Sequence, residues 1–73
     1  MNEVKDVIRI RRKELGLTYE ELGKKCGCDK STVRKWELGQ INNMRRDKII
    51  RLSQALDVSP LVILGMEDFN EDK

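Results

Sequence analysis

Residues 17–39 read LTYEELGKKCGCDKSTVRKWELG, a pattern that predicts two short amphipathic helices joined by a tight turn. Thr18 and Glu21 have the spacing of a capping box, which marks the start of the first helix. Gly27 suits the left-handed residue that ends a helix, and Asp29 is a favourable N-cap for the next one. We therefore expect the first helix to stop at Gly27 and the second to begin two residues later.

The second of these helices has two faces of different character. Val33 and Trp36 stand three residues apart, on the side expected to face the core. The residues expected on the outer side are Lys30, Ser31, Arg34 and Lys35. A short helix that follows a tight turn and presents such a face is how a helix-turn-helix offers its second helix to the major groove of DNA.

The whole chain has 73 residues, enough for one small domain. Its apolar residues recur at helical spacing, with no long alternating run, so we predict a compact all-α fold of five helices. The other three helices are expected at about residues 3–15, 45–56 and 60–64. We expect residues 1–65 to form the domain and residues 66–73 to form an acidic tail.

The positive charge is concentrated before the tail. The formal net charge of the chain is +2, but residues 1–65 carry 14 basic and 9 acidic side chains, a net charge of +5. Between Lys30 and Arg51 there are seven basic residues and two acidic ones. A locally basic surface suits a polyanionic partner such as nucleic acid. The alternative is the mixed charge of an ordinary small helical domain.

Several other classes of site are not expected. Cys26 and Cys28 form a C-x-C pattern, and because the chain has no histidine and no second cysteine pair, it cannot assemble a four-ligand Cys/His zinc site. We expect both cysteines to be small packed side chains, and we predict no metal, cofactor or small-molecule ligand. No paired catalytic base is evident, so an enzyme is the least favoured class. No apolar run approaches the roughly 20 residues of a membrane span, and no signal-peptide pattern precedes the first helix, so we expect a cytoplasmic protein.

Caps, glycines and core positions fall in one consistent register along the chain. The residues that carry this pattern are Leu17-Thr18, Glu21-Leu22, Gly27, Ser31-Thr32-Val33, Trp36-Glu37, Gly39, Leu52, Ala55, Leu56 and Val58. Between residues 4 and 65 the chain therefore resembles the phage-repressor helix-turn-helix family, which includes lambda repressor and Cro. The resemblance implies binding to operator DNA, usually as a homodimer, and control of transcription.

The resemblance also implies which side chains meet the edges of the bases. Lys30, Ser31 and Lys35 match positions that reach base edges in the family, and Arg34 flanks them. A lysine donates to guanine O6 or N7, and a serine pairs with several bases. The alternative for these residues is a solvated, charged helix face.

Other positions match residues that contact the DNA backbone in the family. Tyr19 stands where the family very often has a glutamine that bonds phosphate and braces the recognition helix, and we expect its hydroxyl to donate to phosphate. Thr32 is expected to meet phosphate or to support the turn. The remaining candidates for phosphate contact are Lys24, Gln40, Asn42, Asn43 and Arg45. The alternative for each is an ordinary solvated polar residue.

Two structural features follow from the resemblance as well. Arg12 and Glu37 match a salt bridge that joins the first helix to the end of the recognition helix in many relatives, and we expect it to orient that helix. If such a bridge is exposed, it contributes only about 0–1 kcal/mol. The last helix is the usual dimer surface of the family. Because four consecutive apolar residues there cannot all face one core, we expect dimer contacts from Leu61, Val62 and Leu64.

Together these features predict a sequence-specific, DNA-binding transcriptional regulator, expected to be a homodimeric repressor that reads the major groove. The alternative is an antitoxin-type protein-interaction module that also binds DNA. Only residues 66–73 lie outside the expected domain and would be free to hold a toxin, which favours the first interpretation.

Overall fold

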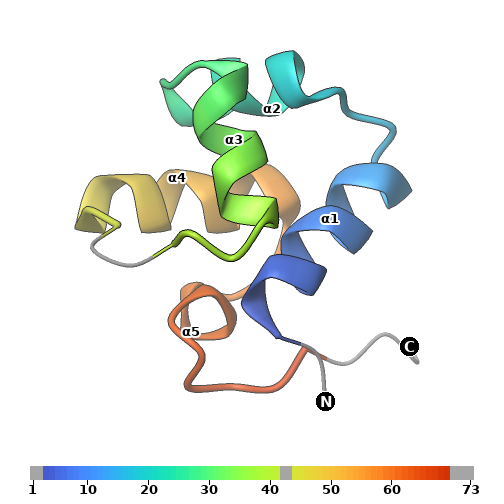
Figure 1. Ribbon diagram of the computed structural model, residues 1–73. Helices are drawn as coiled ribbons and strands as arrows, with labels where there is room; N and C mark the ends of the chain where they lie inside the picture. The colour runs from blue at the N-terminus through green and yellow to red at the C-terminus, as the bar shows by residue number, and fades with distance from the viewer. Residues whose placement is uncertain (1–2, 42–43, 70–73) are drawn as a thin grey trace.

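The computed structural model describes residues 3–41 and 44–69, and its regular elements within these ranges are five α-helices (Figure 1). They are α1 (Val4–Glu14), α2 (Tyr19–Cys26), α3 (Lys30–Glu37), α4 (Arg46–Leu56) and α5 (Pro60–Ile63). The predicted all-α fold is confirmed, and each predicted helix is present with ends that differ by about one residue.

The local signals around the turn behave as the sequence indicates. Thr18 Oγ1 accepts a hydrogen bond from Glu21 N at 3.0 Å, and Glu21 Oε1 accepts one from Thr18 N at 2.9 Å, which completes the capping box. Gly27 ends α2 in the left-handed conformation, with φ of 75°. The side chain of Asp29 then caps α3. These contacts span three residues or fewer, so the residue types near the turn are enough to predict them.

Gly23 allows the turn to lie close against α2. A Cβ atom at this position would stand 2.7 Å from the backbone oxygen of Cys28. The same two residues are joined by a backbone hydrogen bond of 2.8 Å, from Cys28 N to Gly23 O. The close approach that this glycine permits is therefore made by the backbone of the turn that leads into α3.

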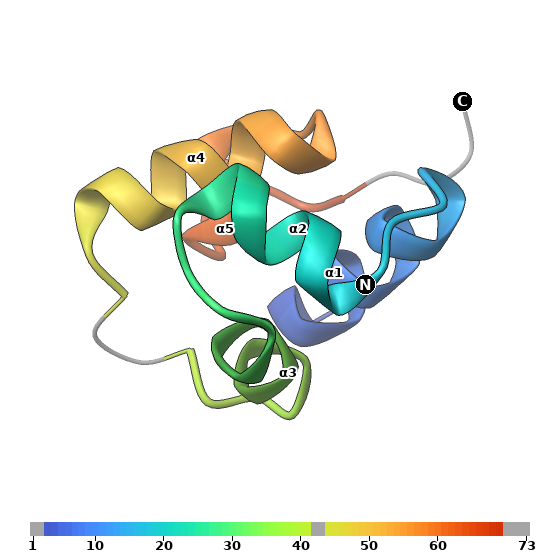
Figure 2. The ribbon, with the colours of Figure 1, turned by 90° about the horizontal axis from the view of Figure 1, so that it is seen from above.

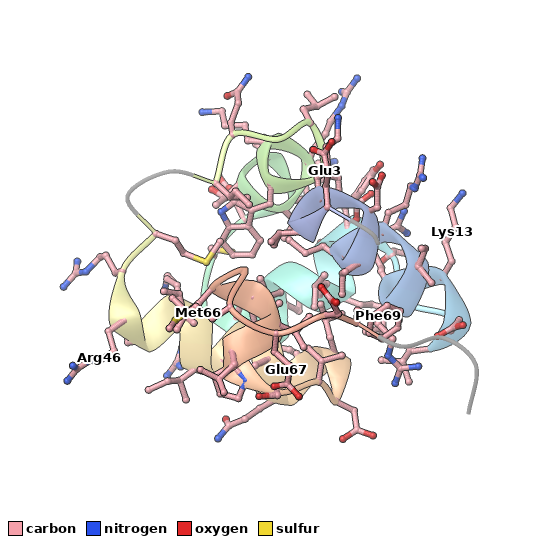
Figure 3. The ribbon with its side chains drawn as sticks, turned by 90° about the horizontal axis from the view of Figure 1, so that it is seen from below. Glu3, Lys13, Arg46, Met66, Glu67 and Phe69 are labelled. Carbon is pink, nitrogen blue, oxygen red and sulfur yellow. The ribbon has the colours of Figure 1, made fainter. Side chains whose placement is uncertain are left out.

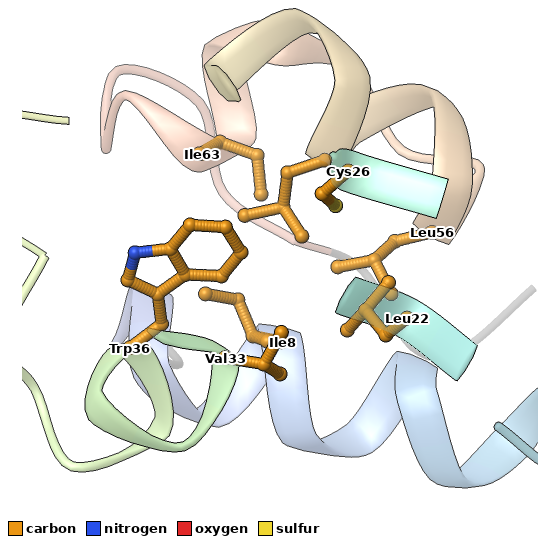
Figure 4. Close-up of a cluster of buried hydrophobic side chains, with 8 residues drawn as sticks. Ile8, Leu22, Cys26, Val33, Trp36, Leu56 and Ile63 are labelled. Atoms are coloured by element: carbon orange, nitrogen blue, oxygen red, sulfur yellow. The ribbon is translucent and has the colours of Figure 1, made fainter. Parts of the chain in front are cut away.

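The helices pack around one core to which all five contribute (Figure 4). The buried residues of this core are Ile8, Leu22, Cys26, Val33, Trp36, Leu52, Leu56 and Ile63. Burial of one large aliphatic side chain stabilises a protein by about 1.5–3 kcal/mol, so this cluster holds α3 against the other helices.

The arrangement leaves one long side of α3 uncovered. α2 lies between α3 and α4 and packs against both, while α1 contacts α3 close to the start of the chain (Figure 2). α4 supports α5, and the segment after α5 runs back toward the start of α1 (Figures 1 and 3). A Cβ on Gly65 in this segment would stand 3.9 Å from Val4 Cγ2. The outer face of α3, formed by Lys30, Ser31, Arg34 and Lys35, is exposed.

Candidate nucleic-acid interface

The outer face of α3 is polar, exposed and basic. Val33 and Trp36 anchor its inner face in the core. The exposed residues of the outer face are Lys30, Ser31, Arg34 and Lys35. The structure thus brings together all four residues that the sequence assigned to base contacts, on a helix whose position is set by two buried side chains.

The start of α3 is closed by a compact cap. Asp29 Oδ1 accepts hydrogen bonds from Thr32 N at 2.9 Å and from Thr32 Oγ1 at 2.8 Å. These bonds, the side-chain one first, hold the pKa of the Asp29 carboxyl below its ordinary value. The hydroxyl of Thr32 thus supports the turn, which is one of the two roles expected for it. Its phosphate contact stays a prediction.

An ion pair joins the end of α3 to α1. Arg12 Nε donates to Glu37 Oε2 at 2.6 Å, and Arg12 Nη2 donates to Glu37 Oε1 at 3.4 Å. The two side chains are 12% and 5% exposed, so the small contribution expected of an exposed bridge does not apply to this pair. The hydrogen bond to Glu37 raises the pKa of Arg12 despite the opposing effect of burial. A buried pair is destabilising to break, because the partner that remains is a buried charge.

Arg12 makes two further contacts at the start of α2. Its Nη1 donates to the carbonyl oxygen of Leu17 at 2.9 Å. Its guanidinium carbon lies 4.3 Å from the centroid of the Tyr19 ring, within the range of a cation–π contact. One side chain of α1 therefore touches both the beginning of α2 and the end of α3.

The other residues expected at phosphates lie around this face at different places. Lys24 is exposed in the last turn of α2, and Gln40 is exposed just beyond α3. Arg45 is the N-cap residue of α4, where its Nε lies 3.8 Å from Asp47 Oδ1 and its side chain is 85% exposed. Asn42 and Asn43 lie outside the described residues.

Two basic residues that the sequence did not single out support the turn. Lys48 Nζ, on α4, donates to the carbonyl oxygen of Gly27 at 3.0 Å. The guanidinium of Arg51 lies where a side chain on Gly27 would be. Their spacing of three residues places both on one side of α4, and a cation at the carboxyl end of α2 is favoured by the helix dipole. From the sequence, this spacing could have predicted that the two residues share a face of α4. It could not predict that they would contact the carboxyl end of α2.

The two cysteines lie beside this turn and behave as packing residues. Cys26 is fully buried, and burial raises the pKa of its thiol to about 11. Cys28 is half-buried, and the pKa of its thiol is also raised, mainly by burial. Within residues 3–41 and 44–69 no cluster of three or more His, Cys, Asp or Glu residues could hold a metal ion.

α5 divides its apolar residues between the core and the surface. Leu61 and Leu64 are 46% and 51% exposed, and Met66 just beyond them is 75% exposed. Val62 and Ile63 are each 6% exposed. Val62, expected at a dimer surface, is therefore buried within the single chain, because the short helix turns it toward the other helices. None of the described helices is long and apolar enough to cross a membrane.

The chain is similar in sequence and structure to known helix-turn-helix domains. A model of the helix-turn-helix family matches residues 8–63. The crystal structure of the P22 c2 repressor protein in complex with a synthetic operator is similar, with a TM-score of 0.81 and 28% identity. That match covers 92% of this chain and 100% of the repressor chain. The solution structure of the DNA-binding domain of the P22 c2 repressor has a TM-score of 0.75 and 30% identity over 96% of both chains.

A third similar structure belongs to a larger protein. Hydroxypropylphosphonic acid epoxidase from S. wedmorenis matches with a TM-score of 0.74 and 20% identity, over 82% of this chain but 31% of the epoxidase. At this identity the likeness concerns the fold alone. No curated protein sequence matches the chain.

Proposed function

The chain belongs to the helix-turn-helix family, of the phage-repressor-like type, and we propose that it is a DNA-binding transcriptional regulator that reads the major groove with α3. The observation that carries this proposal is the outer face of α3, basic and exposed on a helix anchored by Val33 and Trp36. The similar P22 c2 repressor, in complex with its synthetic operator, supports DNA as the polyanionic partner.

The proposed sequence readout rests on the outer face of α3. Lys35 follows Ser31 by one helical turn, so both side chains point to the same strip of the groove. A lysine donates to O6 or N7 of guanine, and a serine hydroxyl both donates and accepts. Lys30 extends this strip toward the start of the helix, and Arg34 flanks it.

The proposed backbone contacts surround that readout. Lys24, Gln40, Arg45 and the Tyr19 hydroxyl supply donors for phosphate oxygens, with Asn42 and Asn43 as further candidates in the loop. Such contacts set the register of the protein on the duplex without carrying sequence information. Thr32 is a further candidate, and its hydroxyl also donates to Asp29.

We assign the protein further as a repressor that acts as a homodimer, with residues 1–65 as the DNA-binding domain and residues 66–73 as an acidic tail. The exposed pair Leu61 and Leu64 on α5 supports a twofold contact between copies. A dimer places its two reading helices about 34 Å apart, one turn of DNA. Leu61→Glu is expected to give a monomer in sedimentation. Leu38→Glu, at the 63% exposed C-cap residue of α3, is expected to leave the dimer intact. A dimer that survives Leu61→Glu contradicts this interface.

The function is tested by selecting duplexes from a random pool and titrating variants on the winner and on a scrambled duplex. Lys35→Ala and Ser31→Ala are expected to weaken binding to the selected duplex by about 1–3 kcal/mol and to reduce the preference for its sequence. Arg45→Ala is the control for a phosphate contact. It is expected to weaken binding to both duplexes alike and to reduce the slope of log K against the logarithm of the salt concentration by about 1. Equal losses on both duplexes for Lys35→Ala would refute base contact, and a pool without a winner would refute sequence-specific binding.

A further inference from the structure

Tyr19 occupies an unusual place for a residue at the start of α2. It is the first residue of the helix, and its half-buried ring packs against the hydrophobic core. The Arg12 guanidinium carbon lies 4.3 Å from the centre of that ring. Neither the capping box nor the proposed phosphate contact of the hydroxyl requires the ring to lie there.

The contacts of Arg12 show what the ring contributes. The edge of the guanidinium donates to Glu37 through Nε and Nη2, and to the Leu17 carbonyl through Nη1. All three guanidinium nitrogen atoms thus donate to acceptors, while the guanidinium carbon lies over the Tyr19 ring. With the side chain of Arg12 left 12% exposed, water has little access to the ion pair.

We propose that Tyr19 is a positioning residue, whose ring shields the Arg12–Glu37 ion pair from water and so holds the end of α3 against α1. An ion pair is stronger where water is excluded, because the local dielectric is lower. Glu37 is the last residue of α3, so this pair fixes the end of the reading helix, in addition to the anchoring by Val33 and Trp36. The consequence for DNA rests on the proposed function, whereas the shielding itself does not.

Two roles of Tyr19 are separable by substitution. Tyr19→Phe keeps the ring and removes the hydroxyl. Tyr19→Leu keeps an apolar side chain at the core and removes the aromatic face, and Tyr19→Gln serves in its place if the leucine variant does not fold. A positioning role of the ring predicts that the ion pair is as well shielded in the phenylalanine variant as in the unchanged protein.

The shielding is measured without DNA, from the exchange of the Arg12 Nε–H with water by ¹⁵N NMR. The unchanged protein and Tyr19→Phe are expected to exchange equally slowly, and Tyr19→Leu about fivefold faster, since a cation–π contact of this kind is lost. The exposed Arg9 Nε–H is the internal control and exchanges equally in all variants. Equal exchange of Arg12 in the tyrosine and leucine proteins overturns the proposal.

The consequence for α3 is measured by titration of the selected duplex. Tyr19→Leu is expected to bind it about fivefold more weakly than Tyr19→Phe, because both variants lack the hydroxyl and only the leucine variant lacks the ring. Any loss in Tyr19→Phe itself measures the proposed hydroxyl–phosphate contact. Equal binding by the two variants overturns the positioning role of the ring. Absence of any selected duplex overturns the proposed function instead, and the Arg12 exchange rates still decide the shielding.

Discussion

Removal of Arg12 is expected to destabilise this domain more than removal of its partner. Arg12→Met keeps the apolar stem of the side chain but leaves the Glu37 carboxylate, 5% exposed, without its cation. It also removes the donor to the Leu17 carbonyl. Breaking a buried pair from one side costs about 3–5 kcal/mol. A 73-residue domain has a total stability of about 4–11 kcal/mol, so this variant is expected to lose a large part of its stability at 25 °C.

Glu37→Gln is expected to cost less, about 1–2 kcal/mol, because Arg12 keeps the Leu17 carbonyl, the Tyr19 ring and a neutral acceptor. The double variant Arg12→Met with Glu37→Gln is then expected to be more stable than Arg12→Met alone, because the buried unpaired charge has been removed. The second substitution therefore rescues the first, which a simple sum of two losses does not predict.

The assay is urea unfolding followed by the fluorescence of Trp36, the one tryptophan of the chain, which is buried in the core. Arg9→Met is the matched control, since Arg9 and Asp6 form an exposed pair at 3.5 Å and its loss is expected to cost about 0–1 kcal/mol. If the double variant is no more stable than Arg12→Met, the reasoning about an uncompensated buried charge is refuted.

Three further predictions concern the turn and its surroundings. Gly27→Ala is expected to cost about 1–2 kcal/mol in urea unfolding, because its φ of 75° is left-handed; an unchanged midpoint would contradict this. Because the pKa of Asp29 is lowered in the folded protein, its carboxylate stabilises the fold at pH values above its ordinary pKa of 3.8. This stabilisation is lost as the pH falls below 3.8. The difference in melting temperature between the unchanged protein and Asp29→Asn should thus shrink from pH 5 to pH 2, and a constant difference would count against it. With a pKa of about 11, about a thousandth of the Cys26 thiol is ionised at pH 8. DTNB should therefore label Cys28 first, because the thiolate is the reactive form. Faster labelling of Cys26 would show that the core opens there.

The local signals of the sequence were sufficient to predict the helices. The capping box of Thr18 and Glu21, the left-handed Gly27 and the cap at Asp29 each involve residues no more than three apart. Their geometry depends on the chain itself, so the pattern of residue types identifies it. The outer face of α3 was also predictable, because helical periodicity alone places its residues on the side opposite Val33 and Trp36.

Prediction of the site from sequence was less complete, because burial depends on what other elements lie nearby. Periodicity allowed any of the apolar residues of α5 to be exposed, and packing against the other helices buried Val62 and left Leu61 and Leu64 outside. The resemblance paired Arg12 with Glu37. The types of two residues 25 positions apart do not indicate that both side chains are shielded from solvent in the fold.

The same reason applies at the start of α2 and at the turn. That Tyr19 lies under the Arg12 guanidinium, and that Lys48 of α4 reaches the Gly27 carbonyl, depends on where α1 and α4 lie relative to α2. The sequence alone determined which segments are helical and which face of α3 is polar, since both follow from contacts within a few residues. Only the tertiary structure decided which charges are buried and which aromatic ring covers them, since those contacts join residues far apart in the chain.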